Sequence, residues 1–204
     1  NFMWTEFTGE TDFGGTRFKG DVYFWKSVFS RGANFLQAKF GRKARFGGAQ
    51  FNGTANFMFA EFTEYAGFGE VQFSGKANFQ QATFGEKVWF LGVVFREDTD
   101  FIETKFKGDS CFITSTFCRD NKFMDAQFGG KTDFREATFH KETDFSGAKF
   151  DAQISFIRLK FNTLYINWAS IKDNLVYDGP AYLALIKNFK AIEQFGDADD
   201  CYYA

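Results

Sequence analysis

The chain has 204 residues, of which 33 are phenylalanine and only one is proline. The hydrophobic fraction of 45% and the charged fraction of 25% are ordinary for a globular protein, so the excess concerns a single residue type. A net charge of −2 excludes a general electrostatic attraction to nucleic acid. The mean hydropathy of −0.31 and the lack of any apolar run of about 18 residues exclude a membrane-spanning helix within these residues.

Phenylalanine recurs from residue 2 to residue 161 at steps that alternate between five and six residues without an exception. This series contains 30 of the 33 phenylalanines and leaves out only Phe59, Phe189 and Phe195. A helix is a poor explanation, because its apolar residues would recur at steps of three and four. The residue two before each phenylalanine is mostly small, and the residue between them is mostly polar. This alternation of inward and outward residues has the two-residue period of a β-strand. The pattern therefore predicts short strands with the phenylalanine and the small residue pointing inward.

The chain must turn between these strands, and the six-residue steps often turn at glycine, as in residues 51–54 and 73–76. Glycine suits a corner because it adopts positive φ without a steric cost. Four consecutive steps take 22 residues. We therefore expect wider corners at the six-residue steps.

The units resemble the pentapeptide-repeat family, and residues 33–37 (Ala-Asn-Phe-Leu-Gln) and 77–81 (Ala-Asn-Phe-Gln-Gln) match its repeat closely. The resemblance implies an all-β solenoid, a right-handed quadrilateral parallel β-helix with four repeats per coil. The extra residue in every second unit departs from the family pattern. It predicts about 22 residues per coil, two wider corners on opposite edges, and about 7 to 8 coils.

The ladder phenylalanines are the expected structural core. The core residues that we single out are Phe35, Phe40, Phe46, Phe51, Phe57, Phe62, Phe79, Phe84, Phe101, Phe106, Phe134 and Phe139.

The repeat weakens after Phe161 but continues at plain five-residue steps, so we assign residues 1–176 to the β-helix and 177–204 to a C-terminal helical segment. The tripeptide 178–180 (Asp-Gly-Pro) predicts a helix start with Pro180 at its first position, and Gly196 predicts its end. Residues 197–200 are compatible with a second helix start. The apolar side chains expected to cap the solenoid or form an interface are Leu185, Ile186, Phe189 and Ile192.

The chain begins in the middle of a repeat, and we expect it to be an excised part of a larger prokaryotic protein. Residues 182–189 with Gly196-Asp197 and Tyr202-Tyr203 are similar to segments that follow such repeats in some archaeal and bacterial membrane proteins. That similarity implies a soluble domain whose parent protein is membrane-tethered.

Residues for catalysis or metal binding are sparse, and we expect no enzyme activity and no cofactor. The single histidine, His140, follows a phenylalanine at a corner, where it reads as an exposed turn residue. Cys111, Cys118 and Cys201 do not have the spacing of a zinc site, and reduced thiols are favoured over a Cys111–Cys118 or intermolecular disulfide. Residues 197–200 (Asp-Ala-Asp-Asp) are too few for a calcium loop.

The residue after the phenylalanine in the shorter step is often apolar, which aligns side chains in two columns on opposite edges. One column contains Met3, Trp25, Leu91 and Ile113, and the other contains Leu36, Met58, Ile102 and Met124. Packing between neighbouring side chains explains these columns, and so does an exposed stripe used for dimerisation or for a protein partner.

Two functions remain open at this stage. The first is a non-enzymatic structural or protein-interaction repeat domain, with a protein partner or self-association and no nucleic acid. The second follows from the resemblance, because some family members mimic DNA and bind type II topoisomerases (gyrase protection). Mimicry needs an acidic rod, but residues 1–161 carry 21 Lys and Arg against 20 Asp and Glu.

Overall fold

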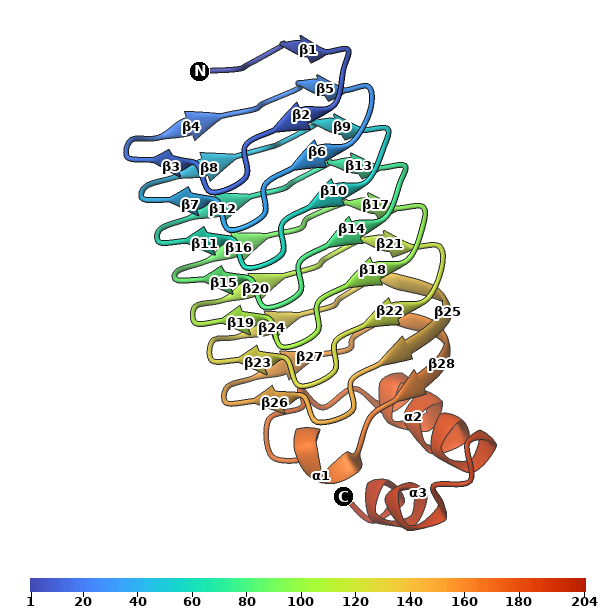
Figure 1. Ribbon diagram of the computed structural model, residues 1–204. Coiled ribbons are helices and arrows are strands. Elements are labelled where there is room, and N and C mark those ends of the chain that lie inside the picture. The colour runs from blue at the N-terminus through green and yellow to red at the C-terminus, as the bar shows by residue number, and fades with distance from the viewer.

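The computed structural model describes residues 1–204 and shows a right-handed rod of stacked coils with helices at its C-terminal end (Figure 1). Each coil has four short strands, and each strand pairs in parallel with the strand 22 residues further on, as Ala55 does with Ala77. The strands therefore stack into four faces, which we number in chain order. This arrangement confirms the predicted quadrilateral β-helix with 22 residues per coil.

The four faces have the following strands. Face 1 contains β1 (Glu6–Phe7), β5 (Val28–Phe29), β9 (Gln50–Phe51), β13 (Gln72–Phe73), β17 (Val94–Phe95), β21 (Thr116–Phe117), the start of β25 (Thr138–Asp144), and the start of β28 (Lys160–Tyr165), whose end pairs with the end of β25 on face 2. Face 2 contains β2 (Thr11–Asp12), β6 (Ala33–Asn34), β10 (Ala55–Asn56), β14 (Ala77–Asn78), β18 (Thr99–Asp100), β22 (Asn121–Lys122) and the end of β25. Face 3 contains β3 (Arg17–Phe18), β7 (Lys39–Phe40), β11 (Glu61–Phe62), β15 (Thr83–Phe84), β19 (Lys105–Phe106), β23 (Gln127–Phe128) and β26 (Lys149–Phe150). Face 4 contains β4 (Val22–Tyr23), β8 (Ala44–Arg45), β12 (Ala66–Gly67), β16 (Val88–Trp89), β20 (Ser110–Cys111), β24 (Thr132–Asp133) and β27 (Ile154–Ser155).

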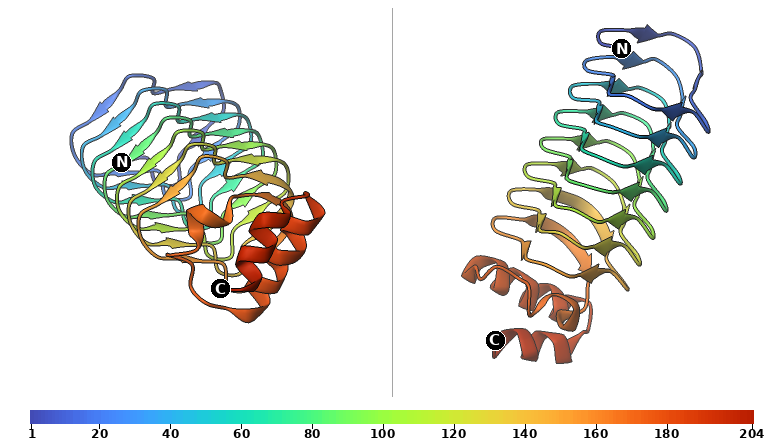
Figure 2. Two further views of the ribbon diagram at one scale, coloured as in Figure 1. Left: turned by 90° about the horizontal axis from the view of Figure 1, so that it is seen from below. Right: turned by 90° about the vertical axis from the view of Figure 1, so that its left-hand side faces the viewer.

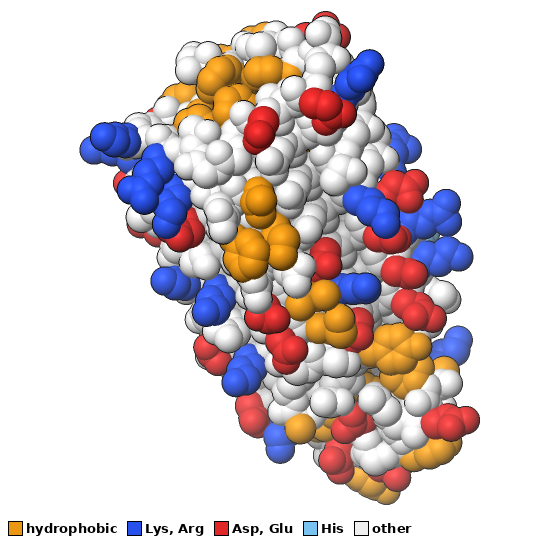
Figure 3. Space-filling model, in the orientation of Figure 1, with side chains coloured by type: hydrophobic (Ala, Val, Ile, Leu, Met, Phe, Trp, Pro, Cys, Tyr) orange, Lys and Arg blue, Asp and Glu red, His pale blue; other side chains and the backbone are white.

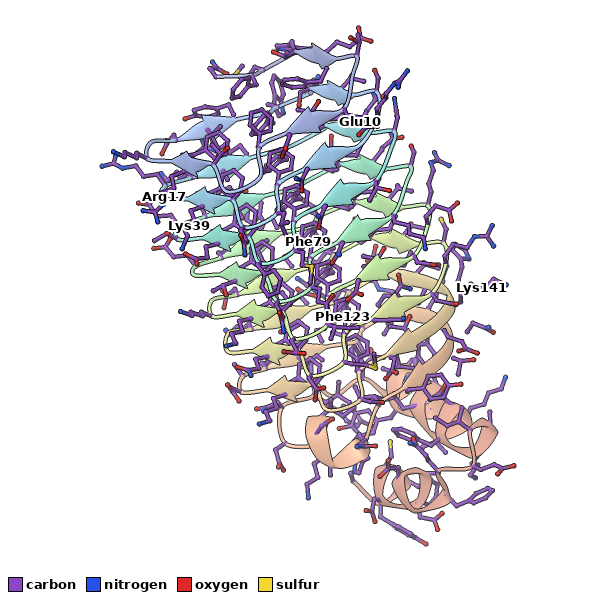
Figure 4. All side chains as sticks on the ribbon, viewed as in Figure 1. Glu10, Arg17, Lys39, Phe79, Phe123 and Lys141 are labelled. Carbon is purple, nitrogen blue, oxygen red and sulfur yellow. The ribbon has the colours of Figure 1, made fainter.

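The interior of the rod is a phenylalanine ladder. Each ring stacks on the equivalent ring of the next coil, as Phe79 does on Phe57 and on Phe101 with ring centroids 4.9 Å apart in both cases. Rings of opposite faces meet edge to face across the interior, as Phe68 of face 4 and Phe79 of face 2 do at 5.6 Å. Every phenylalanine that we singled out as core is buried, and Figure 4 shows Phe79 and Phe123 pointing into the rod. The predicted inward ladder is confirmed.

Positive φ occurs at the short corners, contrary to our expectation for the glycine-rich wide corners. The second residue after the phenylalanine has φ of 56° at Gln37, 55° at Gln81 and 64° at Gly92. A five-residue step leaves too few residues to reverse direction with ordinary φ, so one residue becomes left-handed, at a cost of about 1–2 kcal/mol when it is not glycine. The next coil holds this conformation, because the N–H of Gln81 donates to the carbonyl of Ile102 at 2.8 Å.

Glycines of the wide corners serve a different purpose, which is close approach between coils. A Cβ atom added to Gly75 would lie 2.5 Å from the carbonyl carbon and oxygen of Gly53 in the coil above. None of these wide-corner glycines has positive φ. Where two coils approach this closely, glycine is therefore needed for space.

Polar residues before the phenylalanines of face 2 shape the adjacent short corner. The side chain of Asn78 accepts a hydrogen bond from the N–H of Gln80 at 2.8 Å, and Asp100 does the same for Ile102 at 2.8 Å. This is the Asx-turn geometry that favours Asn and Asp at such positions. Burial raises the pKa of Asp100, and its bond from the Ile102 N–H opposes that effect.

The register changes in the last coil because the step from Phe161 to Ile166 has five residues where six are the rule. β28 pairs with β25 at a spacing of 22 up to Phe139–Phe161, and then a bulge between Phe139 and Glu142 shifts the pairing to Glu142–Thr163. The regular strands end at Tyr165. The helical turn α1 (Trp168–Ile171) then lies within the range to residue 176 that we expected to be repeat, and Ile171 reaches the core from this helix.

Helix α2 (Gly179–Ala191) lies next to the last coil, and α3 (Phe195–Tyr202) packs against α2 and α1 at the far end of the molecule (Figure 2). The carboxylate of Asp178 caps α2 by accepting from the N–H of Ala181 at 3.0 Å. The predicted end at Gly196 is wrong, because α2 ends at Ala191, Glu193 takes φ of 62°, and Gly196 lies inside α3. The residue at the first position of α2 is Gly179, so Pro180 follows it.

The four residues predicted to cap the solenoid differ in burial. Leu185 and Phe189 are fully buried, whereas Ile186 and Ile192 are half-buried and Ile192 follows the helix. The buried side chain of Asn188 accepts from the Leu164 N–H at 3.0 Å and donates to the Leu164 carbonyl at 2.7 Å. Its amide thus takes the place that a further strand would occupy at this point of β28.

Candidate interaction surface

The two predicted apolar columns lie at the short corners and differ in exposure. Met3, Trp25 and Leu91 are exposed at the corner between faces 4 and 1, whereas Ile113 is half-buried. The opposite column, at the corner between faces 2 and 3, consists of half-buried side chains: Leu36, Met58, Ile102 and Met124. Packing within the ladder therefore accounts for much of the second column, and the first is the better candidate for an interaction stripe.

Two tryptophans form a cluster in the first coils beside the exposed column. The rings of Trp4 and Trp25 meet edge to face with centroids 5.3 Å apart, and the Lys26 ammonium lies over both rings at 4.7 and 4.8 Å. Trp4 is 63% exposed and Trp25 is 40% exposed. A cation over the face of an indole ring is attracted by the ring quadrupole. The cluster is therefore an ordered apolar surface with a positive charge at its centre.

A second aromatic pair lies further along face 4. The rings of Tyr65 and Trp89 meet edge to face at 5.9 Å, and the Lys87 ammonium lies 5.1 Å from the Trp89 ring. Trp89 is 38% exposed, and a shallow cleft of about 320 Å³ opens beside it toward Cys111 and the corner. We call the two clusters together the aromatic surface: Trp4, Tyr23, Trp25, Tyr65, Trp89 and Leu91.

Two glycines lie next to rings of these clusters, Gly47 beside Trp25 and Gly67 beside Tyr65. A Cβ atom at Gly47 would meet the Trp25 ring at 3.1 Å, and one at Gly67 would meet the Tyr65 hydroxyl at 2.7 Å. Because glycine has no side chain, the Trp25 and Tyr65 rings can lie close to the backbone of the rod. This contact orders the rings without removing them from solvent.

Sequence reasoning missed Trp4, Tyr23, Tyr65 and Trp89. It followed only the residue after each phenylalanine, whereas Tyr23 and Trp89 precede one. The signal was the outward column of face 4, which reads Tyr23, Arg45, Gly67, Trp89 and Cys111 at the 22-residue spacing. Arg45 lies over the Tyr23 ring at 5.1 Å, so this column also combines aromatic rings with cations.

Charges of both signs are interspersed over the rest of the rod. Figure 3 shows positive and negative side chains mixed on the face that it displays, with small separate groups of hydrophobic side chains between them. Ion pairs link neighbouring coils, as Lys39 does with Glu61 at 2.7 Å and Arg158 with Glu136 at 3.2 Å.

The titratable residues considered for chemistry are dispersed. His140 is exposed on β25, and no group of three or more His, Cys, Asp or Glu side chains is placed to hold a metal ion. The three cysteines are unpaired. Burial raises the pKa of the Cys111 thiol, and it raises that of Cys201 to about 11. None of the helices has both the length and the apolar character needed to cross a membrane.

One family model matches part of the rod. Residues 60–105, about two coils of the rod, match the family model described as pentapeptide repeats (9 copies). These coils are pentapeptide repeats. The solved structure of trypsin-treated QnrB1, described as a plasmid-mediated fluoroquinolone resistance protein, aligns with 13% identity over 77% of this chain and 89% of that chain, with a TM-score of 0.34. No curated protein matches the chain.

Every second repeat of the rod contains one extra residue, and the structure places that residue at the two wide corners. The steps from face 1 to face 2 and from face 3 to face 4 contain it, and these corners lie on opposite edges of the rod, as expected. The short corners between the other faces carry the apolar columns. The extra residue thus marks the polar edges of the rod, and the shorter steps mark the apolar ones.

Proposed function

We propose that this pentapeptide-repeat rod is a non-enzymatic protein-interaction module that binds a partner through the aromatic surface. The observation that supports the proposal is the exposure of Trp4, Trp25 and Trp89 along one side of the rod, outside an interior that already contains 25 buried ladder phenylalanines. Tryptophan, tyrosine and arginine dominate the energetics of protein interfaces. Attachment of the rod to a larger, membrane-tethered protein stays a prediction from the tail sequence.

Order within the surface supports the same proposal. The rings are held by edge-to-face contacts, by the nearby glycine backbone and by Lys26 and Lys87. These rings would therefore lose little side-chain entropy when a partner binds. Their ammonium groups also suit a partner surface with carboxylates. The opposite corner lacks such an arrangement, since its apolar side chains are mostly half-buried.

A second copy of the chain is the partner that a pure sample already contains, so self-association is the first test. We expect sedimentation velocity to show a concentration-dependent dimer, and we expect the double variant Trp4→Ser/Trp89→Ser to remain a monomer. Loss of two exposed aromatic anchors costs about 2 kcal/mol or more each when they are interface hot spots. Circular dichroism of the variant should match that of the wild type, because neither side chain belongs to the ladder.

The matched control is Phe59→Ser, which removes an equally exposed ring from the opposite short corner. We expect it to leave the dimer intact. A wild-type chain that is monomeric at every concentration contradicts self-association. A dimer abolished by Leu36→Lys/Met58→Lys but unaffected by the tryptophan variants would move the interface to the opposite corner.

The DNA-mimic alternative makes a different prediction. A mimic must present an acidic rod, but residues 1–161 carry nearly equal numbers of basic and acidic side chains. We therefore expect no protection of DNA gyrase by this protein in a supercoiling assay with a fluoroquinolone present. Restored supercoiling at stoichiometric amounts of the protein would support mimicry over the interaction module proposed above.

A further inference from the structure

We propose that the groove between β28 and α2 binds an extended, acidic peptide segment of a partner protein as an added β-strand. The groove has a volume of about 450 Å³ and lies at the capped end of the rod, several coils from the aromatic surface. One wall is the strand segment 159–163, and the other wall is one side of α2. The site is thus separate from the surface on which the proposed function rests.

The strand wall has a free hydrogen-bonding edge. β28 pairs only with β25. The N–H of Lys160 donates to the carbonyl of Ala137 at 3.0 Å, so the N–H and carbonyl of the next residue, Phe161, face the opposite edge. Phe95 occupies the equivalent position three coils earlier, and its carbonyl accepts a hydrogen bond from the N–H of Cys118 in the next coil at 2.8 Å. Phe161 has no such strand beyond it.

Asn188 shows that this edge takes a strand-like partner. Its side-chain amide bonds both the N–H and the carbonyl of Leu164, which closes one end of the groove. From Leu164 back to Lys160 no side chain of α2 repeats this contact. A strand segment of about four residues, roughly 13 Å long, therefore borders the groove, and the N–H and carbonyl of Phe161 at its centre have no strand partner.

The helix wall determines which peptide fits. Its lining residues recur at three- and four-residue steps along one side of α2 and its C-cap: Ala184, Lys187, Asn188, Ala191 and Ile192. The small side chains of Ala184 and Ala191 leave room for a backbone, and the partly exposed Phe161 ring and Ile192 offer apolar contact. The only charged residues lining the groove are Lys160 and Lys187, both exposed. An extended peptide with alternating acidic and apolar side chains complements this groove.

The test measures binding of a fluorescein-labelled peptide, Glu-Val-Glu-Val-Glu, to the full chain by fluorescence anisotropy. We expect saturable binding and protection of the Phe161 amide from hydrogen exchange in the complex. Two peptides serve as controls. Lys-Val-Lys-Val-Lys reverses the charge, and Glu-Pro-Glu-Pro-Glu keeps the charge but lacks two backbone N–H donors. Neither should bind.

Variants of the groove complete the experiment. Lys160→Glu/Lys187→Glu should weaken binding of the acidic peptide by about tenfold or more, whereas Lys190→Glu, an exposed lysine of α2 outside the groove, should change it by less than about twofold. The proposal is overturned if the acidic peptide does not bind, if the proline peptide binds as well, or if the double variant binds normally. A wild-type dimer that Lys187→Glu dissociates would assign the groove to a second copy instead.

Discussion

Replacing Phe79 by alanine should lower the free energy of unfolding by about 3–5 kcal/mol, the usual range for a buried phenylalanine. Phe79 is fully buried in the middle of the ladder, with rings stacked on both sides at 4.9 Å and further rings edge-on. The four-sided backbone limits collapse around the cavity, because each coil is hydrogen-bonded to the coils above and below. Urea unfolding monitored by circular dichroism measures the loss.

Phe59→Ala is the matched control, since Phe59 lies outside the ladder and is 40% exposed. We expect the control to change the free energy of unfolding by no more than about 0.5 kcal/mol. A loss below about 1 kcal/mol for Phe79→Ala would contradict its place in the core.

Replacing Gly75 by alanine should destabilise the protein by about 1–3 kcal/mol, although the change adds a single methyl group to a corner. That methyl carbon would lie 2.5 Å from the backbone carbonyl of Gly53, and the corner can relieve the overlap only by separating two hydrogen-bonded coils. The midpoint of urea unfolding should fall accordingly.

Gly9→Ala is the control for the same column of the same wide corner. Gly9 has no neighbouring atom within 4 Å of an added Cβ, and its φ is not positive. Removing glycine there restricts the unfolded chain, so we expect a gain of about 0.4–1 kcal/mol. Equal losses for both variants would mean that the corner needs glycine for its backbone conformation and not for its space.

The repeat made the fold predictable to an unusual depth. The alternation of five and six residues predicted the short strands and the inward direction of the phenylalanines, because every coil repeats one local environment. The four faces, and with them the 22-residue register, followed from the resemblance to the pentapeptide-repeat family. The change of step after Phe161 was also visible, but its consequence, the bulge in β25, depends on pairing between two coils. The end of α2 at Ala191 was missed because Gly196 is a typical terminator, whereas Glu193 takes the left-handed conformation here.

The candidate site was less predictable. Trp25 and Leu91 were found from the column of residues that follow the phenylalanines, but Trp89 and Tyr65 were not, since their contact joins two coils. The groove beside β28 could not be seen at all, because it exists only where α2 folds back along the last strand.

The sequence by itself determined the coil, since a strict spacing of large and small residues can bury its rings in one periodic way. Only the tertiary structure decided where positive φ occurs, which glycines are needed for space, and which side chains meet between coils. These properties depend on contacts between residues 22 apart, or on how the helices close the end of the rod, and local spacing carries no information about either.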